Sequence, residues 1–552
     1  MRSRVTISLL VSMTLVLAAC TRTASAPTDT TATLAATVLS HCTDINAPEL
    51  GEGSLCIDNG FRVKSDDFSF KNWGRSNSAD ANVTAQTLID LFGHSNVCTP
   101  GTPTECVLRP TMIQKLEQWN NALSGGRCEG LATLSNRLFL KYDHPSQFSP
   151  AAQRTVDIEQ TSEAFTQSTV YWWATQFLPE VTDRAAQSRT KSPLALVDDL
   201  IQGLANGVGY TLGMYFGSSG HAVTPFAVTH RNGTFVVHVY DNNHPGERRE
   251  ILVDATQNTW SYPDAVTRID GSKVEWTGSK GTFELIPMSA RQGPFTCAFC
   301  LTNSDDARTV LTIASRDPNA SGYVYIRTRD GETLDVNPES IVNTISGATY
   351  SVGKGAQNAV ATISLPESVT DFDVYVRRVS PVVPAGDVVI NLKQKDAAAI
   401  QVSGNLAEAV IGDTRDSSAV LAVRESDTTI HAPLSSNARI SLALGSSLSR
   451  TNLVRDTALV ISHVSSETID VSIKGADGRI VDSNRIDSGI GDTTAEITLE
   501  LDAQRKLRTT KSAIVPLRVQ PQTERSFVSD KARQTTSTTT SVPSSIVISQ
   551  PD

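Results

Sequence analysis

The spacing of apolar residues changes once along this chain, close to Cys300, and this change limits what the chain can fold into. Before Cys300, helical periodicity is followed by short alternating runs that are typical of strands. After it, short runs rich in Val, Ile and Thr alternate with Gly, Asp, Asn and Pro. We therefore predict an α+β region followed by an all-β, sandwich-like region. The predicted helices span 84–92, 110–123, 129–141, 156–177 and 193–204, and the strands before Cys300 span 221–229, 235–240, 249–254 and 282–287.

A chain of 552 residues is too long for one hydrophobic core and indicates roughly two to four units. We place an α+β domain at 42–303, a β-sandwich-like domain at 304–400 and a second β-rich domain at 401–519. Both ends of the chain are rich in Thr and Ser and have few apolar residues to bury. We expect a Thr-rich tether over 20–41 and a disordered tail over 520–552.

The N-terminal residues have the composition of an export signal. Two arginines precede an apolar run over 5–17, which ends in small residues before Cys20. The sequence Leu-Ala-Ala-Cys at 17–20 resembles the lipobox of bacterial lipoproteins, which implies that the signal peptide 1–19 is removed and that Cys20 carries lipid. No later run reaches about eighteen apolar residues, so we expect an extracytoplasmic protein anchored to a bacterial membrane by lipid. The alternative is an ordinary signal peptide with an incidental Cys20.

The acidic balance of the chain limits its partners. The formal net charge is -10 at pH 7, which argues against nucleic acid because phosphate binding needs clustered Lys and Arg. His230, His238 and His244 lack the spacing of metal ligands. The sequence has no phosphate loop, no dinucleotide-binding glycine pattern and no Gly-x-Ser-x-Gly motif. We therefore expect no nucleic-acid partner, no metal and no other cofactor.

The cysteine count singles out one thiol. If Cys20 carries lipid, seven of the eight cysteines remain, and six of them lie close together in pairs, as disulfides do outside the cytoplasm. The unpaired residue is Cys128, and a free thiol in an oxidising compartment indicates that its chemistry is used. The alternatives for Cys128 are a buried structural cysteine and a fourth disulfide. The expected disulfides are Cys42 with Cys56, Cys98 with Cys106, and Cys297 with Cys300, the last in preference to half of a zinc site or a redox pair.

Cys128 follows two glycines and stands at the start of a predicted helix. The positive end of a helix favours a thiolate, and its free backbone N–H groups can face an oxyanion. His221 opens a predicted strand and Asp241 follows the next one, so antiparallel pairing brings them together. Asn242 and Asn243 are weaker candidates for the group that orients the imidazole. The alternatives are a core histidine at 221 and ordinary turn chemistry at 241.

A glycine-flanked cysteine at a helix start, a Gly-His pair on a later strand and an Asp or Asn after the next strand resemble the papain-like cysteine peptidase superfamily. The resemblance covers about residues 42–300. It implies that Cys128 is the nucleophile, that His221 is the general base and then the general acid, and that Asp241 orients the imidazole.

Two further positions bear on this resemblance. Papain-like enzymes carry a glutamine before the cysteine that completes the oxyanion hole, and the resemblance favours Gln118 for that role, ahead of Gln114 and Asn121. In papain a tryptophan follows the nucleophile, whereas this chain has Glu129. The relationship is therefore distant.

The implied activity is acyl transfer through a thioester on Cys128. Such an enzyme would be a cell-surface, lipid-anchored cysteine hydrolase that cleaves, or transfers, the acyl group of an amide in a peptide, a protein or a cell-wall polymer. A second class stays open, a catalytically silent surface adhesion or scaffold lipoprotein that binds through its β-rich half. The separation of the Cys128 sulfur from the His221 ring distinguishes the two, because catalysis needs these groups in contact.

Overall fold

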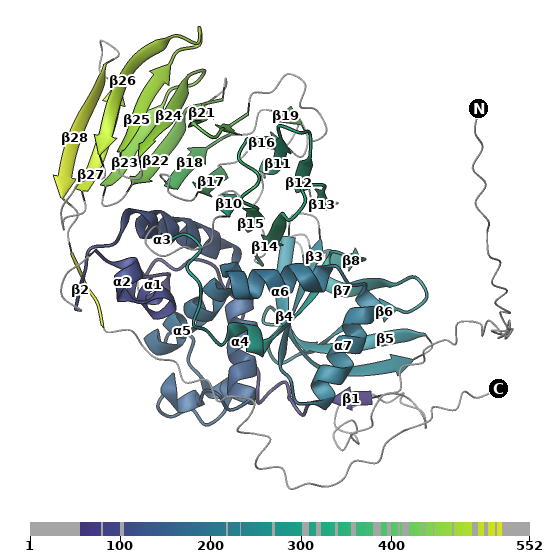
Figure 1. The fold of residues 1–552 in the computed structure, drawn as a ribbon. Coiled ribbons are helices and arrows are strands. Elements are labelled where there is room, and N and C mark those ends of the chain that lie inside the picture. Colours follow the sequence, from purple (N-terminus) through teal and green to yellow (C-terminus); the bar gives the residue numbers. More distant parts are fainter. Residues whose placement is uncertain are drawn as a thin grey trace, which may run out of the picture. The chain divides into compact units, whose positions relative to one another are not determined.

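The structure is a computed structural model, in which helices and a sheet are followed along the chain by a β-rich part (Figure 1). The expected signal peptide and tether, the tail after residue 520, and Cys20 and Cys42 lie outside the described residues. The described ranges are 56–78, 81–99, 104–216, 219–231, 233–267, 271–300, 308–315, 322–336, 341–354, 360–378, 388–394, 399–406, 409–410, 419–433, 436–444, 447–465, 468–487, 495–501, 506–513 and 516–520.

Capping side chains and prolines set where the helices of the first part begin. Thr84 Oγ1 accepts the Thr87 N–H at the start of α1, and Ser192 caps α7 in the same way. Proline occupies the first turn of α3, α6 and α7. None of the described helices has the length and apolar character needed to cross a bilayer. The helices are α1 (Ala85–Phe92), α2 (His94–Val97), α3 (Pro110–Ala122), α4 (Cys128–Phe139), α5 (Glu163–Ala174), α6 (Pro179–Arg189) and α7 (Pro193–Ala205).

Three helices differ from the sequence prediction, and one of them is the four-residue α2, which was not predicted. The helix predicted over 156–177 begins only at Glu163, because Ser162 Oγ accepts a backbone N–H and caps the first turn. The following helix, α6, was not predicted, because Val181 and Ala185 are its only buried apolar side chains and give a weak periodic pattern.

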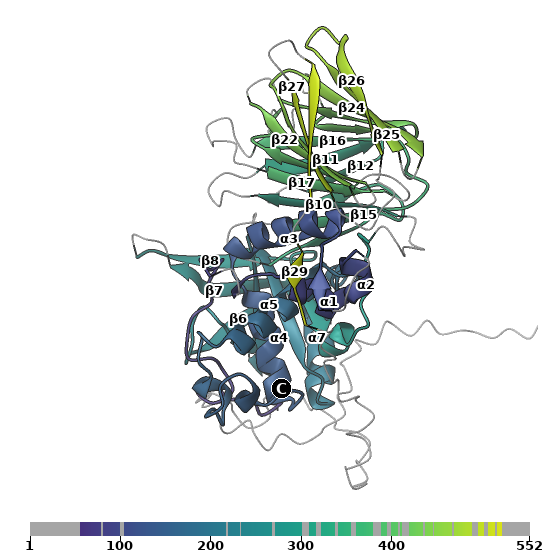
Figure 2. The same cartoon turned by 90° about the vertical axis from the view of Figure 1, so that its left-hand side faces the viewer.

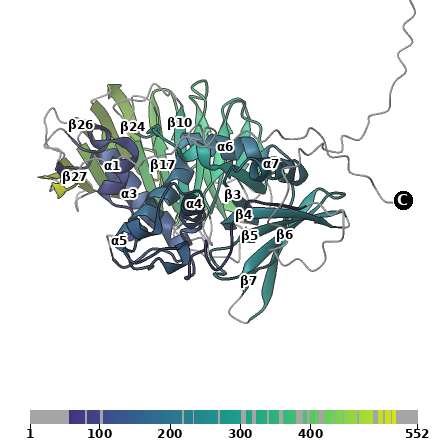
Figure 3. The same ribbon diagram turned by 90° about the horizontal axis from the view of Figure 1, so that it is seen from below.

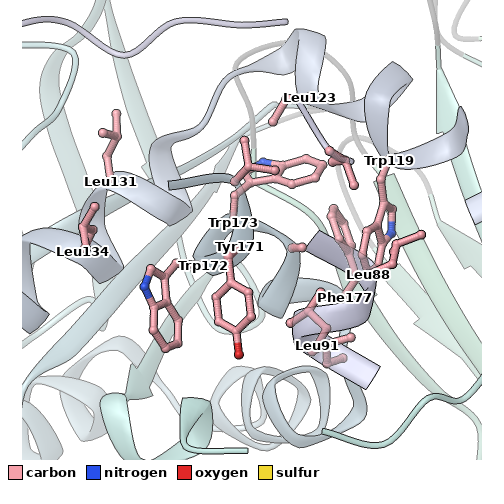
Figure 4. Close-up of a cluster of buried hydrophobic side chains, with 14 of the residues drawn as sticks. Leu88, Leu91, Trp119, Leu123, Leu131, Leu134, Tyr171, Trp172, Trp173 and Phe177 are labelled. Carbon is pink, nitrogen blue, oxygen red and sulfur yellow. The ribbon is translucent and has the colours of Figure 1, made fainter. Parts of the chain in front are cut away.

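Aromatic side chains fill the core between the helices. Trp119 of α3 and Trp173 of α5 are at most 1% exposed, and both contact the ring of Phe177 (Figure 4). The helices approach closely at Gly130 of α4, where a Cβ would lie 2.1 Å from the Thr169 carbonyl oxygen of α5. This contact fixes α4 between α5 on one side and strands β3 and β4 on the other (Figure 3).

An antiparallel sheet completes the first part, in the order β8-β7-β6-β5-β4-β3-β9, with β1 paired to β4. The predicted antiparallel pairing is present between β4 and β5, and its register pairs Thr224 with Tyr240. This register brings His221 and Asp241 to the same end of the two strands. The strands are β1 (Cys56–Asp58), β3 (Tyr210–Phe216), β4 (Ser219–Arg231), β5 (Thr234–Tyr240), β6 (Arg248–Asp254), β7 (Thr259–Thr267), β8 (Lys273–Gly278) and β9 (Phe283–Pro287).

The part after Cys300 is built from two large sheets (Figure 1 and Figure 2). One sheet has nine strands, β14 (Thr349–Val352), β15 (Val360–Leu365), β10 (Thr309–Ser315), β17 (Val388–Lys393), β18 (Ala399–Gly404), β22 (Ala438–Leu444), β23 (Ser447–Leu453), β27 (Ala495–Leu501) and β28 (Leu507–Ala513). The other has ten, β13 (Ile341–Asn343), β12 (Thr333–Val336), β11 (Gly322–Thr328), β16 (Phe372–Arg378), β20 (Leu421–Val423), β21 (Asp427–His431), β24 (Ala458–Ser465), β25 (Thr468–Lys474) and β26 (Ile480–Asp487), with β19 (Ala409–Val410) beside β16. The chain thus has an α+β fold with a β-rich C-terminal region.

The boundary predicted at residue 400 has no counterpart in these sheets. Residue 400 lies inside β18, which pairs with β17 before it and β22 after it. Strand β16 likewise pairs with β20. Apolar side chains from both sheets form one buried cluster that runs from Leu311 to Ile486. Long-range pairing therefore joins the two predicted β domains into one core.

The two parts of the chain contact each other through side chains of α3. Gln114 Nε2 donates to the Ser441 carbonyl oxygen at 2.9 Å, and Glu117 forms an ion pair with Arg450 at 2.8 Å. Near residue 518, β29 (Leu517–Arg518) pairs with β2 (Glu105–Cys106) of the first part. These contacts connect α3 and its neighbours to the β-rich part.

Candidate active site

Cys128 is the first residue of α4, and a 3-10 turn, η3 (Leu123–Gly125), precedes it. Gly126 joins the turn to the helix with a φ of 116°, which disfavours any side chain. A Cβ at Gly126 would also lie 2.8 Å from Asn72 Nδ2. The other end of the same amide, Asn72 Oδ1, accepts the Arg127 N–H at 2.7 Å. Backbone conformation and space therefore both require glycine at 126.

The thiol of Cys128 is free and fully buried. It lies in a small apolar cluster with Ala132 and Ala222. Cys56 is disulfide-bonded, and its expected partner Cys42 lies outside the described residues. Two expected disulfides are confirmed, Cys98 with Cys106 and Cys297 with Cys300.

His221 of β4 lies with both other residues that the sequence placed with it. Its Nε2 is 2.7 Å from Asp241 Oδ1, and the Cys128 side chain is close enough to help raise the pKa of the ring. Burial opposes the charged imidazolium, but the Asp241 carboxylate, its hydrogen bond and the Cys128 side chain outweigh burial and raise the pKa of His221 to about 10. The ring, 4% exposed, is therefore protonated at neutral pH and stands between a carboxylate and a thiol.

Asp241 follows β5 and is fully buried. Its Oδ1 also accepts the Asn243 N–H at 2.8 Å, and its Oδ2 accepts the Tyr262 hydroxyl of β7. Burial disfavours the carboxylate, but the charge of His221 and these hydrogen bonds lower the pKa of Asp241 to about 2. Asp241 is therefore ionised at neutral pH and fixes the orientation of the His221 ring.

The two asparagines after Asp241 have different contacts. Asn242 Nδ2 donates to the carbonyl oxygens of Ala222 at 2.9 Å and Cys128 at 3.2 Å. Asn242 thus joins β4 to the first turn of α4. Asn243 Nδ2 is 3.4 Å from His221 Nε2, a longer contact than that of Asp241. Asp241 is the closer partner of the imidazole, as the sequence favoured.

The structure does not bring Gln118 to this group. Gln118 is buried on α3, where its Oε1 accepts a hydrogen bond from Lys115 Nζ and its Nε2 lies 3.3 Å from the Thr312 carbonyl oxygen of β10. Gln114, on the same helix, donates to Ser441 of β22. The expected oxyanion role of Gln118 is therefore corrected: its amide faces the β-rich part, because distance along the sequence does not determine which face of α3 a side chain occupies.

Buried charges surround Glu129, the residue after Cys128. Lys354 Nζ lies 2.8 Å from Glu129 Oε2 and 2.6 Å from Glu284 Oε1. Arg291 forms an ion pair with Glu129, and Arg189 forms one with Glu284. Burial alone would raise the pKa of Glu129, but the charges of Lys354 and Arg291 lower it. Lys354 follows β14, so a side chain of the β-rich part neutralises carboxylates beside the first turn of α4.

A segment without regular structure, 59–78, crosses the site, and we call it the strap. Asp67 Oδ2 accepts the Gly246 N–H at 2.7 Å, and the Asn72 N–H donates to the Asn242 carbonyl oxygen at 2.7 Å. The guanidinium of Arg127 lies 4.7 Å from the ring centre of Trp73. The strap therefore connects the residues before α4 to the turn after β5.

Two residues of this site were not predicted from the sequence. Tyr262 follows the ordinary alternation of a strand, and only the sheet order shows that β7 places it at Asp241. Asn72 lies in the strap, outside every predicted element. Among the described residues, no group of three or more His, Cys, Asp or Glu side chains is placed to share a metal ion.

Comparisons with protein-family models, with curated proteins and with solved structures gave no match to this chain. The chemistry of the site is therefore inferred from the contacts of its own residues.

Proposed function

We propose that the chain is a papain-like cysteine hydrolase that cleaves an amide, or transfers its acyl group, through a thioester on Cys128. One observation carries this proposal: the His221 ring is 2.7 Å from the Asp241 carboxylate and is close enough to the Cys128 side chain for the two to interact. A thiol, an imidazole and an orienting carboxylate in contact form the arrangement that nucleophilic cysteine catalysis needs.

The first half of the proposed reaction forms the thioester. The Cys128 thiolate attacks the carbonyl carbon, a C–S bond forms, and the carbonyl electron pair moves to oxygen. When that pair returns, the C–N bond breaks and the leaving amine takes a proton from the His221 imidazolium. Asp241 keeps the ring oriented and does not exchange a proton. The products of this half are a free amine, an acyl group on Cys128 and a neutral His221.

The second half releases the acyl group. Neutral His221 takes a proton from water, whose oxygen attacks the thioester carbon, and the C–S bond then breaks. A carboxylic acid leaves, and the thiolate and imidazolium are restored. An amine in place of water would give acyl transfer. We also propose that the protein acts outside the cytoplasm, attached to a membrane through lipid on Cys20, on a peptide, protein or cell-wall amide; the two disulfides support an oxidising compartment.

An ester substrate and an alkylating agent test this function together. The full chain should release p-nitrophenol from p-nitrophenyl acetate with an acetyl group detected on Cys128, and iodoacetamide should modify Cys128 faster than it modifies a free thiol. Cys128→Ala and His221→Ala should lower the esterase rate by about 10³-fold or more. His230→Ala, at the far end of β4, is the matched control and should keep the wild-type rate. A wild-type chain with an inert Cys128 would contradict the proposal.

The burial of the site favours a second candidate function. Cys128 and Asp241 are fully buried and His221 is 4% exposed, so the ion pair could serve only to join β4 to β5. The protein would then be a catalytically silent adhesion or scaffold protein that binds through its β-rich part. The labelling experiment separates the two, because a silent relative would show no reactive thiol.

A further inference from the structure

The start of α4 offers a backbone donor beside the nucleophile. Cys128 occupies the first position of the helix, so its N–H has no acceptor within the helix. A tetrahedral oxyanion is usually stabilised by more than one preorganised donor. Gln118 cannot supply a second donor here, because its amide is engaged by Lys115 and lies against Thr312.

Asn72 presents an amide donor next to the same residues. The Arg127 N–H can bond only to an oxygen, so its 2.7 Å contact identifies the Oδ1 end of the Asn72 amide. The Nδ2 end then faces Gly126, 2.8 Å from the position of a Cβ on that glycine. Within the part of the chain that the structure describes, no acceptor is found for Asn72 Nδ2. The donor is therefore beside the nucleophile loop and available to a ligand.

Contacts on both sides hold this amide in place. The Asn72 N–H donates to the Asn242 carbonyl oxygen at 2.7 Å, and Asn242 Nδ2 in turn donates to the Cys128 carbonyl oxygen at 3.2 Å. The next residue, Trp73, lies against the guanidinium of Arg127. Asn72 is only partly buried, so its side chain can meet a substrate. A donor that is fixed before the reaction needs no reorganisation when charge develops.

We propose that Asn72 is a catalytic residue that stabilises the oxyanion together with the Cys128 N–H. This inference rests on the function proposed above. When the sulfur attacks the carbonyl carbon, the oxygen takes up the π electron pair and accepts hydrogen bonds from Asn72 Nδ2 and the Cys128 backbone. Asn72 transfers no proton and forms no covalent bond. Gly126 is glycine in part because this amide occupies the space of its side chain.

Two reactions of the same thiol test the role. Acylation by p-nitrophenyl acetate passes through a tetrahedral oxyanion, whereas alkylation by iodoacetamide displaces iodide at a saturated carbon and forms none. Asn72→Ala and Asn72→Asp should lower kcat for acylation by about 10²-fold with little change in KM, because neither side chain can donate to the oxyanion. Both variants should be alkylated at the wild-type rate. Asn77→Ala, an exposed position in the strap, is the control and should match wild type in both reactions.

Each outcome decides one claim. If Asn72→Ala acylates at the wild-type rate while Cys128→Ala is inactive, the role of Asn72 is wrong and the proposed hydrolase stands. If acylation and alkylation fall together, or if the thermal unfolding of Asn72→Ala differs from that of Asn77→Ala, Asn72 supports the loop and is not catalytic. If the wild-type chain performs neither reaction, the proposed function fails first and the role of Asn72 fails with it.

Discussion

The two parts of the chain bury different kinds of side chain. In residues 308–520 the core cluster is almost entirely Val, Ile and Leu, arranged by the alternation of two sheets. In residues 56–300 an aromatic core adjoins buried charges, among them His221, Asp241 and Glu129. Buried charges are costly unless they are paired and hydrogen-bonded. The first part therefore depends on paired buried charges as well as on apolar packing, whereas the core of the second part is stabilised mainly by apolar packing.

One side chain crosses this division. Lys354 belongs to the β-rich part, but its ammonium group lies between Glu129 and Glu284 of the first part. The two parts are therefore not independent modules. Substitutions in each part test how far the stability of the protein and the esterase rate depend on that part.

The largest expected effect is a pH dependence of the free energy of unfolding that arises from His221 and Asp241 in the first part. His221 has a folded pKa of about 10 against 6.5 unperturbed, so its stabilisation is complete below about pH 6.5 and is lost as the pH rises through 10. We expect the loss to be on the order of 5 kcal/mol. The pKa of Asp241, about 2 against 3.8, gives the opposite sign: its stabilisation is present above about pH 4 and is lost as the pH falls through 2.

Urea unfolding across this pH range, followed by tryptophan fluorescence, measures the effect. All six tryptophans lie in the first part, so the signal reports on that part. His221→Gln should remove most of the alkaline loss. Equal alkaline losses in wild type and His221→Gln would contradict the prediction.

A somewhat smaller loss of stability is expected when Lys354, which pairs with carboxylates of the first part, is replaced. Lys354→Met leaves Glu129 and Glu284 without their shared cation and should lower the free energy of unfolding by about 4 kcal/mol. Because Glu129 adjoins Cys128, the esterase rate should fall as well. The control Arg485→Gln breaks an exposed ion pair with Asp470 and should have no measurable effect. If Lys354→Met unfolds like wild type, the two parts are less dependent on each other than the contacts indicate.

A cavity in the aliphatic core should separate stability from activity. Ile461→Ala, at a fully buried position of β24, should lower the free energy of unfolding by about 3 kcal/mol. The esterase rate per folded molecule should stay at the wild-type value, because Ile461 lies in the β-rich core cluster. Circular dichroism gives the stability, and active-site titration gives the folded fraction. A large loss of specific activity would show that the β-rich core shapes the site more directly.

The smallest effect concerns the second hydrogen bond to Asp241. Tyr262→Phe removes the hydroxyl that Asp241 Oδ2 accepts and should lower the free energy of unfolding by about 2 kcal/mol. It should also raise the pKa of Asp241, shifting the acidic limb of the stability profile to higher pH. Tyr375→Phe removes a hydroxyl that lies 3.5 Å from the partly exposed Asp373 of β16, a longer and weaker hydrogen bond, and should change stability less. Equal effects of the two variants would contradict the expected difference between the two hydrogen bonds.

The features that the sequence predicted correctly depend on residues that are close together along the chain. Two glycines mark the start of the α4 helix at Cys128, a Gly-His pair and a polar turn mark the ends of β4 and β5, and close spacing predicts the two disulfides. The α+β character and the β-rich region follow from periodicity alone. The catalytic roles of Cys128, His221 and Asp241 stay a proposal.

The remaining features depend on contacts between distant residues. Asn72 lies in an irregular segment without a periodic pattern, so the sequence does not predict that its side chain accepts the Arg127 N–H. Gln118 faces the β-rich part because of the way α3 lies against β10 and β22, which its sequence does not show. The two β sheets include a parallel pairing of β23 with β27 across a long connection, so a boundary placed from turn residues alone could not anticipate their shared core.

The position of Lys354 also has a consequence for the order of events during synthesis. A ribosome makes Glu129 and Glu284 well before it makes the lysine that neutralises both. A nascent chain that ends before Lys354 can pair Glu129 with Arg291 and Glu284 with Arg189, but it lacks the cation that lies between the two carboxylates. The full set of ion pairs beside Cys128 is thereby delayed until the β-rich part has begun to form.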